Sequence, residues 1–287
     1  MRKTMTELDG NIGFIGAGNM AEAMTGAIIS SKIMPPSRIT VCDINQDRLD
    51  TMKKTYGVNT GCDLADLFSS SDIVILAVKP QVMDNILSQL AASPHFRPKK
   101  RKLLMSIAAG IPLARIETHL YPMLDEPSRK NLPVIRVMPN TPSLVLAGMS
   151  GYCLNSMADK ADAANAEIIL ASMGRTLLCD ESLMDAITAV SGSGPAYFFF
   201  MVESMVTAGT RLGLSPDQAL LLSIQTMKGA AALLEQSNEF PDILRKKVTS
   251  PGGTTEAAIR VFSECGLGGI VEKALEAAAR RSKELSC

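Results

Sequence analysis

Short apolar runs alternate with helical patterns along residues 1–180. The runs occupy residues 12–15, 39–42, 73–78, 103–107, 134–138, 148–154 and 176–179. Continuous apolar runs of this length are typical of strands that are covered on both faces of a sheet. Strands that alternate with helices indicate βα units. We therefore predict an α/β domain with a Rossmann-type parallel sheet over residues 1–180.

The pattern changes at residue 181, where strand signals end and helical signals replace them. Pro195 suits the first turn of a long helix over 196–212, which is apolar on all sides and is therefore expected to be buried. About 100 helical residues with such apolar faces form a small core by themselves. We predict that residues 181–287 form an all-α domain for substrate binding and dimerisation.

The first apolar run leads directly into a glycine-rich turn. Gly16 permits a tight turn, Gly18 allows the backbone to approach a pyrophosphate, and Ala21 keeps the following helix close to the sheet. The start of that helix offers free N–H groups to phosphates. The alternative is a glycine-rich turn that binds nothing. The strand–turn–helix context favours a dinucleotide site.

Asp43 follows the second apolar run. An acidic residue there typically binds the adenosine ribose hydroxyls and favours NAD over NADP. It lies somewhat beyond the usual spacing of about 20 residues from the turn. Asn45 and Arg48 are alternative contacts for a 2′-phosphate, and Asp43 is also a candidate cap for the next helix.

Further candidate contacts follow the later strands. Lys79 comes at the carboxyl end of a predicted strand, the edge where open α/β sheets bind ligands, although a solvated lysine fits the sequence nearly as well. The small residues 108–110 let a ligand approach the backbone, and residues 139–142 form a stiff loop with a polar tip.

A second candidate site occupies residues 250–255, with the sequence SPGGTT, immediately before a predicted helix. Gly252 and Gly253 allow a concave set of N–H donors, and the helix adds its positive end. This arrangement suits a substrate carboxylate. The alternative is that Thr254 or Thr255 only caps the helix; two adjacent threonines still leave one hydroxyl free for a ligand.

The composition of the chain argues against several classes of function. Lys and Arg together number 29, as do Asp and Glu, so nothing indicates a nucleic-acid partner. The six cysteines lack metal or redox spacing, and His95 and His119 have no clustered partners, so no metal site is expected. No signal peptide or membrane-spanning run is expected, and a reducing cytoplasm is the predicted compartment. The basic run 97–102 is interpreted as a solvated loop.

Six segments together resemble pyrroline-5-carboxylate reductases. They read NIGFIGAGNMAEAM (11–24), AVKPQVM (77–83), SIAAGIPL (106–113), VIRVMPNTP (134–142), VSGSGPAY (190–197) and SPGGTTEA (250–257). The resemblance covers nearly the whole chain after the first ten residues. It implies reduction of the imine of 1-pyrroline-5-carboxylate with NADH or NADPH, which is the last step of L-proline synthesis. It also implies interlocked homodimers, with decamers in some members.

The resemblance also implies roles for individual residues. Substrate would be held by Ser250, Gly253, Thr254 and Thr255, with Thr255 beside the ring nitrogen as the catalytic hydroxyl. The cofactor would be bound by Ile15, Gly16, Ala17, Gly18, Asn19, Met20, Ala77, Val78, Lys79, Ala108 and Asn140. Many members carry Ser, Thr or Asn at the position of Asp43, so this chain departs from the family there, and the departure favours NADH.

Two other functions were weighed. A β-hydroxyacid dehydrogenase needs a general base, usually a lysine on the first interdomain helix, and residues 195–210 contain no lysine. A non-catalytic dinucleotide sensor has no need for the 250–255 loop, yet both glycines and both threonines are present. The oligomer count and any feedback by proline do not follow from the sequence.

Overall fold

The computed structural model describes residues 8–93 and 96–285. It divides into two compact units, one of Met1–Ser193 with Ala278–Cys287 and one of Gly194–Ala277. The expected domain boundary at residue 180 precedes this division. The intervening residues, together with the end of the last helix, belong to the first unit. Ser282 in that helix end donates a 2.6 Å hydrogen bond to Asp185 Oδ1.

The first unit contains an eight-stranded sheet with the order β3-β2-β1-β4-β5-β6-β7-β8. Neighbouring strands are parallel except for β6 and β7, which are antiparallel. This arrangement confirms the predicted Rossmann-type fold. The strands are β1 (Ile12–Ile15), β2 (Ile39–Cys42), β3 (Asn59–Gly61), β4 (Ile73–Leu76), β5 (Leu103–Ser106), β6 (Val134–Met138), β7 (Gly148–Leu154) and β8 (Gly174–Leu178).

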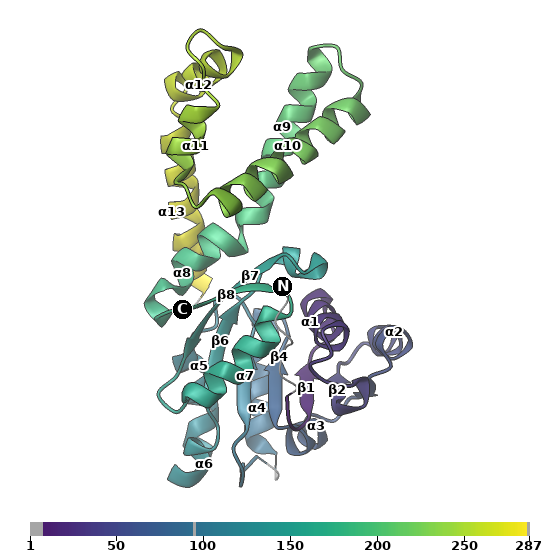
Figure 1. The fold of residues 1–287 in the computed structure, drawn as a ribbon. Helices are drawn as coiled ribbons and strands as arrows, with labels where there is room; N and C mark the ends of the chain where they lie inside the picture. Colours follow the sequence, from purple (N-terminus) through teal and green to yellow (C-terminus); the bar gives the residue numbers. More distant parts are fainter. Residues whose placement is uncertain (1–7, 94–95, 286–287) are drawn as a thin grey trace. The chain divides into compact units, whose positions relative to one another are not determined.

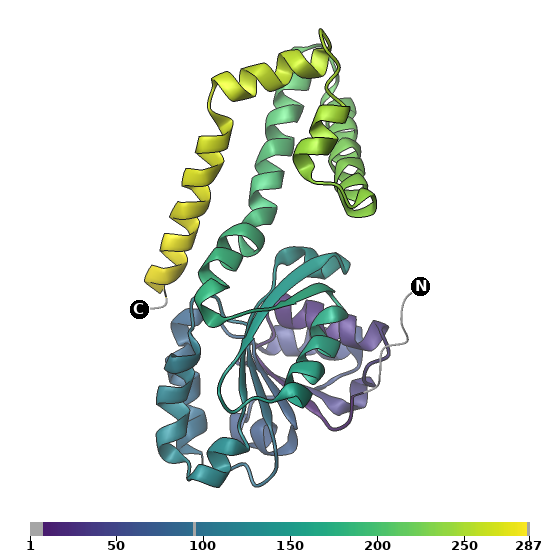
Figure 2. The same cartoon turned by 60° about the vertical axis from the view of Figure 1, so that its left-hand side comes forward.

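Helices cover both faces of this sheet (Figures 1 and 2). On one face α1 (Asn19–Ser30), α2 (Gln46–Tyr56) and α7 (Lys160–Ala171) bury their apolar sides in a core that includes Phe14. On the other face α3 (Leu64–Ser70), α4 (Met83–Ala92) and α5 (Leu113–Leu120) pack in a core that includes Phe68. Two covered faces explain why the central strands β1 and β4 are apolar throughout.

Shorter elements connect these layers. They are η1 (Pro36–Arg38), η2 (Pro80–Val82), η3 (Tyr121–Met123), α6 (Glu126–Lys130), η4 (Thr141–Val145), η5 (Glu181–Leu183), α8 (Met184–Ile187) and the π-helical turn η6 (Thr188–Gly192). Neither η6 nor the edge strand β3 was predicted. β3 is the short, polar sequence Asn-Thr-Gly, which lacks the apolar pattern of a strand.

The basic run 97–102 is only partly solvated, so the interpretation as a solvated loop was wrong at its end. Arg101 pairs with Asp162 on α7, and Lys102 is buried with Nζ donating to the carbonyl of Ser71. Burial lowers the pKa of Lys102. These two cations serve the fold of the first unit.

The second unit is helical, as predicted. It contains α9 (Gly194–Arg211), α10 (Pro216–Ser237), α11 (Pro241–Lys247), α12 (Thr254–Glu264) and most of α13 (Leu267–Leu285). Ser215 and Gln218 form a capping box at the start of α10. α9 and α10 pack side by side (Figures 1 and 2).

The prediction that the helix over 196–212 is buried was wrong for the single chain. Phe198, Phe199 and Phe200 on α9 are 61%, 65% and 68% exposed, and α10 exposes Leu221 to 69%. The four remaining helices of this unit are too few to cover a helix that is apolar on all sides. Exposed apolar surface of this extent is typical of protein–protein contacts.

Candidate functional site

The candidate cofactor site lies where the strand order reverses, between β1 and β4. Chain connections run from β1 outward to β3 on one side and from β4 outward on the other, so the loops after β1 and β4 diverge there. Open α/β sheets bind ligands at such a point. The two loops are in direct contact, because the N–H of Ala77 donates to the carbonyl of Ile15 at 2.8 Å.

Gly16 and Gly18 shape the turn after β1 in different ways. Gly16 has φ +106°, and a β-carbon there would lie 2.6 Å from the carbonyl oxygen of Ala77. Only glycine fits such a position. Gly18 is exposed and extended, and a β-carbon on it would meet no atom within 4 Å. The first glycine is therefore required by the fold, whereas the second keeps an open space above the turn.

Three backbone donors remain available at this open turn. The N–H of Gly16 donates to the carbonyl of Cys42 at 2.7 Å, and the N–H of Ala17 donates to Asp43 Oδ2 at 2.6 Å. The N–H groups of Gly18, Asn19 and Met20 have no acceptor within the described parts of the chain. Together with the positive end of α1 they suit an anion, so the residues present fit a dinucleotide pyrophosphate.

Asp43 follows β2 and is tied to this turn. Its Oδ1 accepts from the N–H of Asn45 at 2.8 Å, while its Oδ2 accepts from Ala17. The N-cap of α2 is Asn45, whose side chain accepts from the N–H of Arg48, so the alternative that Asp43 caps this helix was wrong. The carboxylate is half-buried beside the turn, at the end of β2 where a ribose is expected.

Arg48 and Glu22 are linked beside the same turn. Arg48 Nε donates to the carbonyl of Ala17 at 2.8 Å, and Arg48 Nη2 lies 2.6 Å from Glu22 Oε2. Arg48 is therefore engaged by Ala17 and Glu22, while Asn45 uses only its Oδ1, as the N-cap of α2. Sequence reasoning did not single out Glu22. It lies in the first turn of α1, where a carboxylate interacts favourably with the helix dipole.

The other predicted cofactor residues lie at the ends of β4, β5 and β6. Lys79 is exposed and makes no ion pair with any residue that the structure describes. Ala108 is buried after β5, and Ala77 and Val78 are half-buried. Because β1, β4, β5 and β6 are parallel neighbours, these residues share one edge of the sheet with the glycine turn.

Unlike the other predicted cofactor residues, Asn140 uses its side chain for hydrogen bonds that stabilise the fold. Its Oδ1 accepts from the N–H of Met149 at 2.8 Å, and its Nδ2 donates to the carbonyl of Ser191 at 3.1 Å. The side chain thereby connects the loop after β6 to both β7 and η6. Any contact of Asn140 with a cofactor would come in addition to this structural role.

We expect Asn140→Ala to lower the free energy of unfolding by about 1–3 kcal/mol, because the N–H of Met149 and the carbonyl of Ser191 both lose a partner. Urea unfolding of the variant and the wild type measures this difference. An unchanged midpoint accompanied by weaker cofactor binding would contradict the structural role.

The second candidate site is the loop between α11 and α12, within the helical unit. Gly252 has φ +71°, and the N–H of Gly253 donates to the carbonyl of Ser250 at 3.0 Å. A β-carbon on Gly253 would lie 2.5 Å from Ser250 Oγ. The N–H of Gly252 donates to Glu256 Oε2 at 2.8 Å. The glycines therefore close a tight turn and leave the first N–H groups of α12 as the anion donors.

Thr254 and Thr255 are the first two residues of α12, and Gly253 is its N-cap without a side-chain hydrogen bond. The alternative that one threonine caps the helix was wrong. Neither hydroxyl has a hydrogen-bond partner among residues 8–93 and 96–285. Both hydroxyls are thus available at this helix start.

Metal chemistry and membrane insertion were also considered. Within the described residues, no group of three or more His, Cys, Asp or Glu side chains is placed to hold a metal ion. His119 lies beside Asp84, with Nε2 3.7 Å from Oδ1, and His95 falls outside the described residues. None of the described helices is long and apolar enough to span a membrane.

A parallel sheet with an open glycine turn at its switch point defines the class of a dinucleotide-binding protein. Comparisons with known proteins agree. Residues 11–110 match the family model "NADP oxidoreductase coenzyme F420-dependent", and residues 181–285 match "pyrroline-5-carboxylate reductase dimerisation". The chain belongs to the pyrroline-5-carboxylate reductase family.

Individual members of the family are similar to this chain over nearly their full length. Pyrroline-5-carboxylate reductase of Pseudomonas aeruginosa is 41% identical over 276 residues, covering 96% of both chains. The Arabidopsis thaliana reductase is 37% identical, covering 96% of this chain and 95% of the relative. The structure of the Coxiella burnetii reductase superposes with a TM-score of 0.87 at 37% identity, covering 97% and 99% of the two chains. The Plasmodium falciparum reductase, solved with NADP bound, gives 0.84 at 29% identity, covering 98% and 100%.

Proposed function

We propose that this protein reduces 1-pyrroline-5-carboxylate to L-proline with NADH or NADPH, the last step of proline biosynthesis. Relatives that carry this name match almost the entire chain. The observation that carries the proposal is the loop 250–255, where two threonine hydroxyls without a hydrogen-bond partner among the described residues stand at the start of α12. A dinucleotide-binding protein without a substrate has no need of such a loop.

We propose that residues 1–180 bind the dinucleotide and that residues 181–287 bind the substrate and form the dimer. The pyrophosphate is held by the turn from Ile15 to Met20, chiefly through the N–H groups of Gly18, Asn19 and Met20. Ala77, Val78, Lys79, Ala108 and Asn140 line the path of the ribose and nicotinamide. Their shared position at one sheet edge supports this assignment.

The substrate carboxylate is assigned to the start of α12, with Ser250, Gly253 and Thr254 shaping the site. Thr255 is assigned to the ring nitrogen, where its hydroxyl orients the imine and assists its protonation. The bound nicotinamide supplies the hydride to the imine carbon, the C=N electron pair passes to the nitrogen, and the oxidised cofactor leaves. A protonated imine is already electrophilic, so the protein contributes position and electrostatics.

We propose that the cofactor preference is for NADH. The Asp43 carboxylate lies at the end of β2, where it accepts from Ala17 and Asn45 and places negative charge near the expected ribose. A ribose 2′-hydroxyl can donate to such a carboxylate, whereas a 2′-phosphate is repelled by it.

A single assay tests the reaction and the preference. The full-length protein is mixed with pyrroline-5-carboxylate and either NADH or NADPH, and the absorbance of the reduced cofactor is followed. We expect turnover with both cofactors and a higher kcat/KM with NADH. No loss of absorbance with either cofactor would overturn the proposed reaction, and a clearly higher value with NADPH would overturn the role of Asp43.

We further propose a homodimer, with dimers able to assemble further into a decamer, in the cytoplasm. The exposed phenylalanines of α9 and the dimerisation family match support self-association. The described cysteines are free thiols, which suits a reducing compartment. Mass measurement in solution distinguishes a dimer from a decamer.

A further inference from the structure

An ion pair joins α1 to α2 beside the cofactor turn. Arg48 Nη2 and Glu22 Oε2 are 2.6 Å apart, and the two side chains are 30% and 26% exposed. The same guanidinium donates from Nε to the carbonyl of Ala17 at 2.8 Å. Arg48 is therefore held from two directions, by the backbone of the turn and by the carboxylate of α1.

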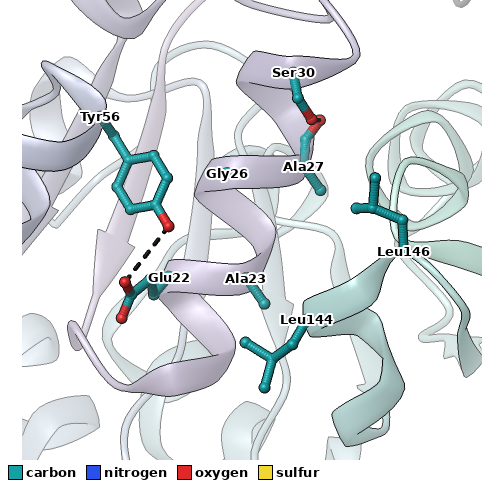
Figure 3. A pocket seen from close by; sticks show the side chains of 8 residues that line it. All are labelled: Glu22, Ala23, Gly26, Ala27, Ser30, Tyr56, Leu144 and Leu146. Atoms are coloured by element: carbon teal, nitrogen blue, oxygen red, sulfur yellow. Dashed lines mark hydrogen bonds between the residues drawn. The ribbon is translucent and has the colours of Figure 1, made fainter.

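Glu22 is itself held in place from the side opposite to Arg48. The Tyr56 hydroxyl donates to Glu22 Oε1 at 3.4 Å, and Figure 3 shows this contact between α2 and α1. Burial, followed by the charge of Glu22, raises the pKa of Tyr56. Both residues border a pocket of about 270 Å³ next to Leu144 and Leu146. Each oxygen of Glu22 thus faces a donor on α2.

Arg48 is the one cation in the first turn of α2, the helix that follows Asp43. An arginine near the end of the second strand is the group that accommodates a 2′-phosphate in NADP-binding sheets of this kind. Here Glu22 and Ala17 use the guanidinium instead. A 2′-phosphate at this edge would have to compete with the Glu22 carboxylate for Nη2 of Arg48.

We propose that Glu22 is a specificity-determining residue that disfavours NADPH by holding Arg48 against α1. This inference rests on the proposed NADH preference and extends it to a residue outside the cofactor contacts. Glu22 is a positioning residue, because it acts through Arg48. Asp43 and Glu22 then act together, one by repelling a 2′-phosphate and the other by withholding its partner.

The test is the affinity of the full-length Glu22→Ala variant for each cofactor, measured by titration of the fluorescence of NADPH and of NADH. We expect NADPH to bind about fivefold more tightly than to the wild type, in line with an ion pair of this exposure, and NADH to change by less than about twofold. Alanine is a good helix former, so α1 is retained. Thermal unfolding verifies this.

Two matched variants separate the mechanism from its alternatives. Glu22→Ala/Arg48→Ala is expected to lose the gain in NADPH affinity, since the freed arginine is absent. If the gain persists, removal of a distant negative charge explains it and the inference is overturned. Tyr56→Phe removes only the 3.4 Å contact and is expected to leave the ratio of the two affinities unchanged.

The wild-type affinities separate the inference from the proposed function. Tighter binding of NADPH than NADH by the wild type would overturn the proposed preference and the inference with it. A wild type that favours NADH, combined with an unchanged affinity ratio in Glu22→Ala, would overturn the inference alone.

Discussion

Replacing Thr255 by alanine is expected to lower turnover at least tenfold while leaving cofactor affinity nearly unchanged. The Thr255 hydroxyl is at the start of α12 and has no partner among the described residues, so its removal breaks no hydrogen bond of the fold. The loss of about 1.4 kcal/mol or more corresponds to one hydrogen bond to the reacting imine. Steady-state kcat and a separate NADH titration measure the two quantities.

Thr255→Ser is the matched control, since it keeps the hydroxyl and removes only a methyl group. It is expected to retain turnover within about threefold of the wild type, because the contact assigned to the ring nitrogen survives. Wild-type turnover in Thr255→Ala would rule out the catalytic assignment. An equal loss in both variants would instead indicate that the methyl group, through packing, is the part that matters.

The architecture of the first unit was largely predictable. Strands such as β1 and β4 are wholly apolar because both faces of the sheet are covered, and this pattern is visible in the sequence. β3 was missed because Asn59, Thr60 and Gly61 pair by backbone hydrogen bonds that place no demand on side chains. The π-helical turn η6 was missed because the glycines and serines of 191–194 are also typical of a loop.

The helical unit shows a different limit. The apolar faces of α9 and α10 predict burial, and the single chain leaves both faces exposed. A hydrophobic pattern predicts that one face of a helix is buried. It does not indicate whether the same chain or another chain covers that face. We therefore expect a partner chain to cover the exposed phenylalanines of α9. The sequence pattern alone does not identify that chain.

The location of the candidate site was predictable from the sequence. The hydrogen bonds and ion pairs between its side chains were not. The glycine turn and the strand-end loops were found because their residue types recur at fixed places in this fold. Asp43 accepts hydrogen bonds from Ala17 and Asn45, and Arg48 donates to Ala17 and Glu22. These contacts depend on how α1 and α2 face each other. Side chains 26 residues apart in sequence meet there, and no local pattern encodes that contact.

Gly16→Ala is expected to destabilise the first unit by about 2–4 kcal/mol, because the backbone is in a region that L-residues avoid and the new methyl group overlaps a neighbouring loop. Gly16 has φ +106°, and its β-carbon would lie 2.6 Å from the carbonyl oxygen of Ala77. Backbone atoms cannot rotate away as a side chain can, so the loops after β1 and β4 must separate. Urea unfolding and NADH titration are both expected to show the effect.

Gly18→Ala provides the comparison, because it adds the same methyl group two residues later in open space. Gly18 has φ −71°, which alanine adopts without strain, and no atom lies within 4 Å of the added carbon. We expect stability within about 1 kcal/mol of the wild type, because alanine is a poorer N-cap of α1 than glycine, and NADH binding at least about tenfold weaker, since the methyl group occupies the approach to the free N–H groups. Unchanged NADH affinity in this variant would place the pyrophosphate elsewhere. The pair thus separates a glycine that the fold requires from a glycine that the ligand requires.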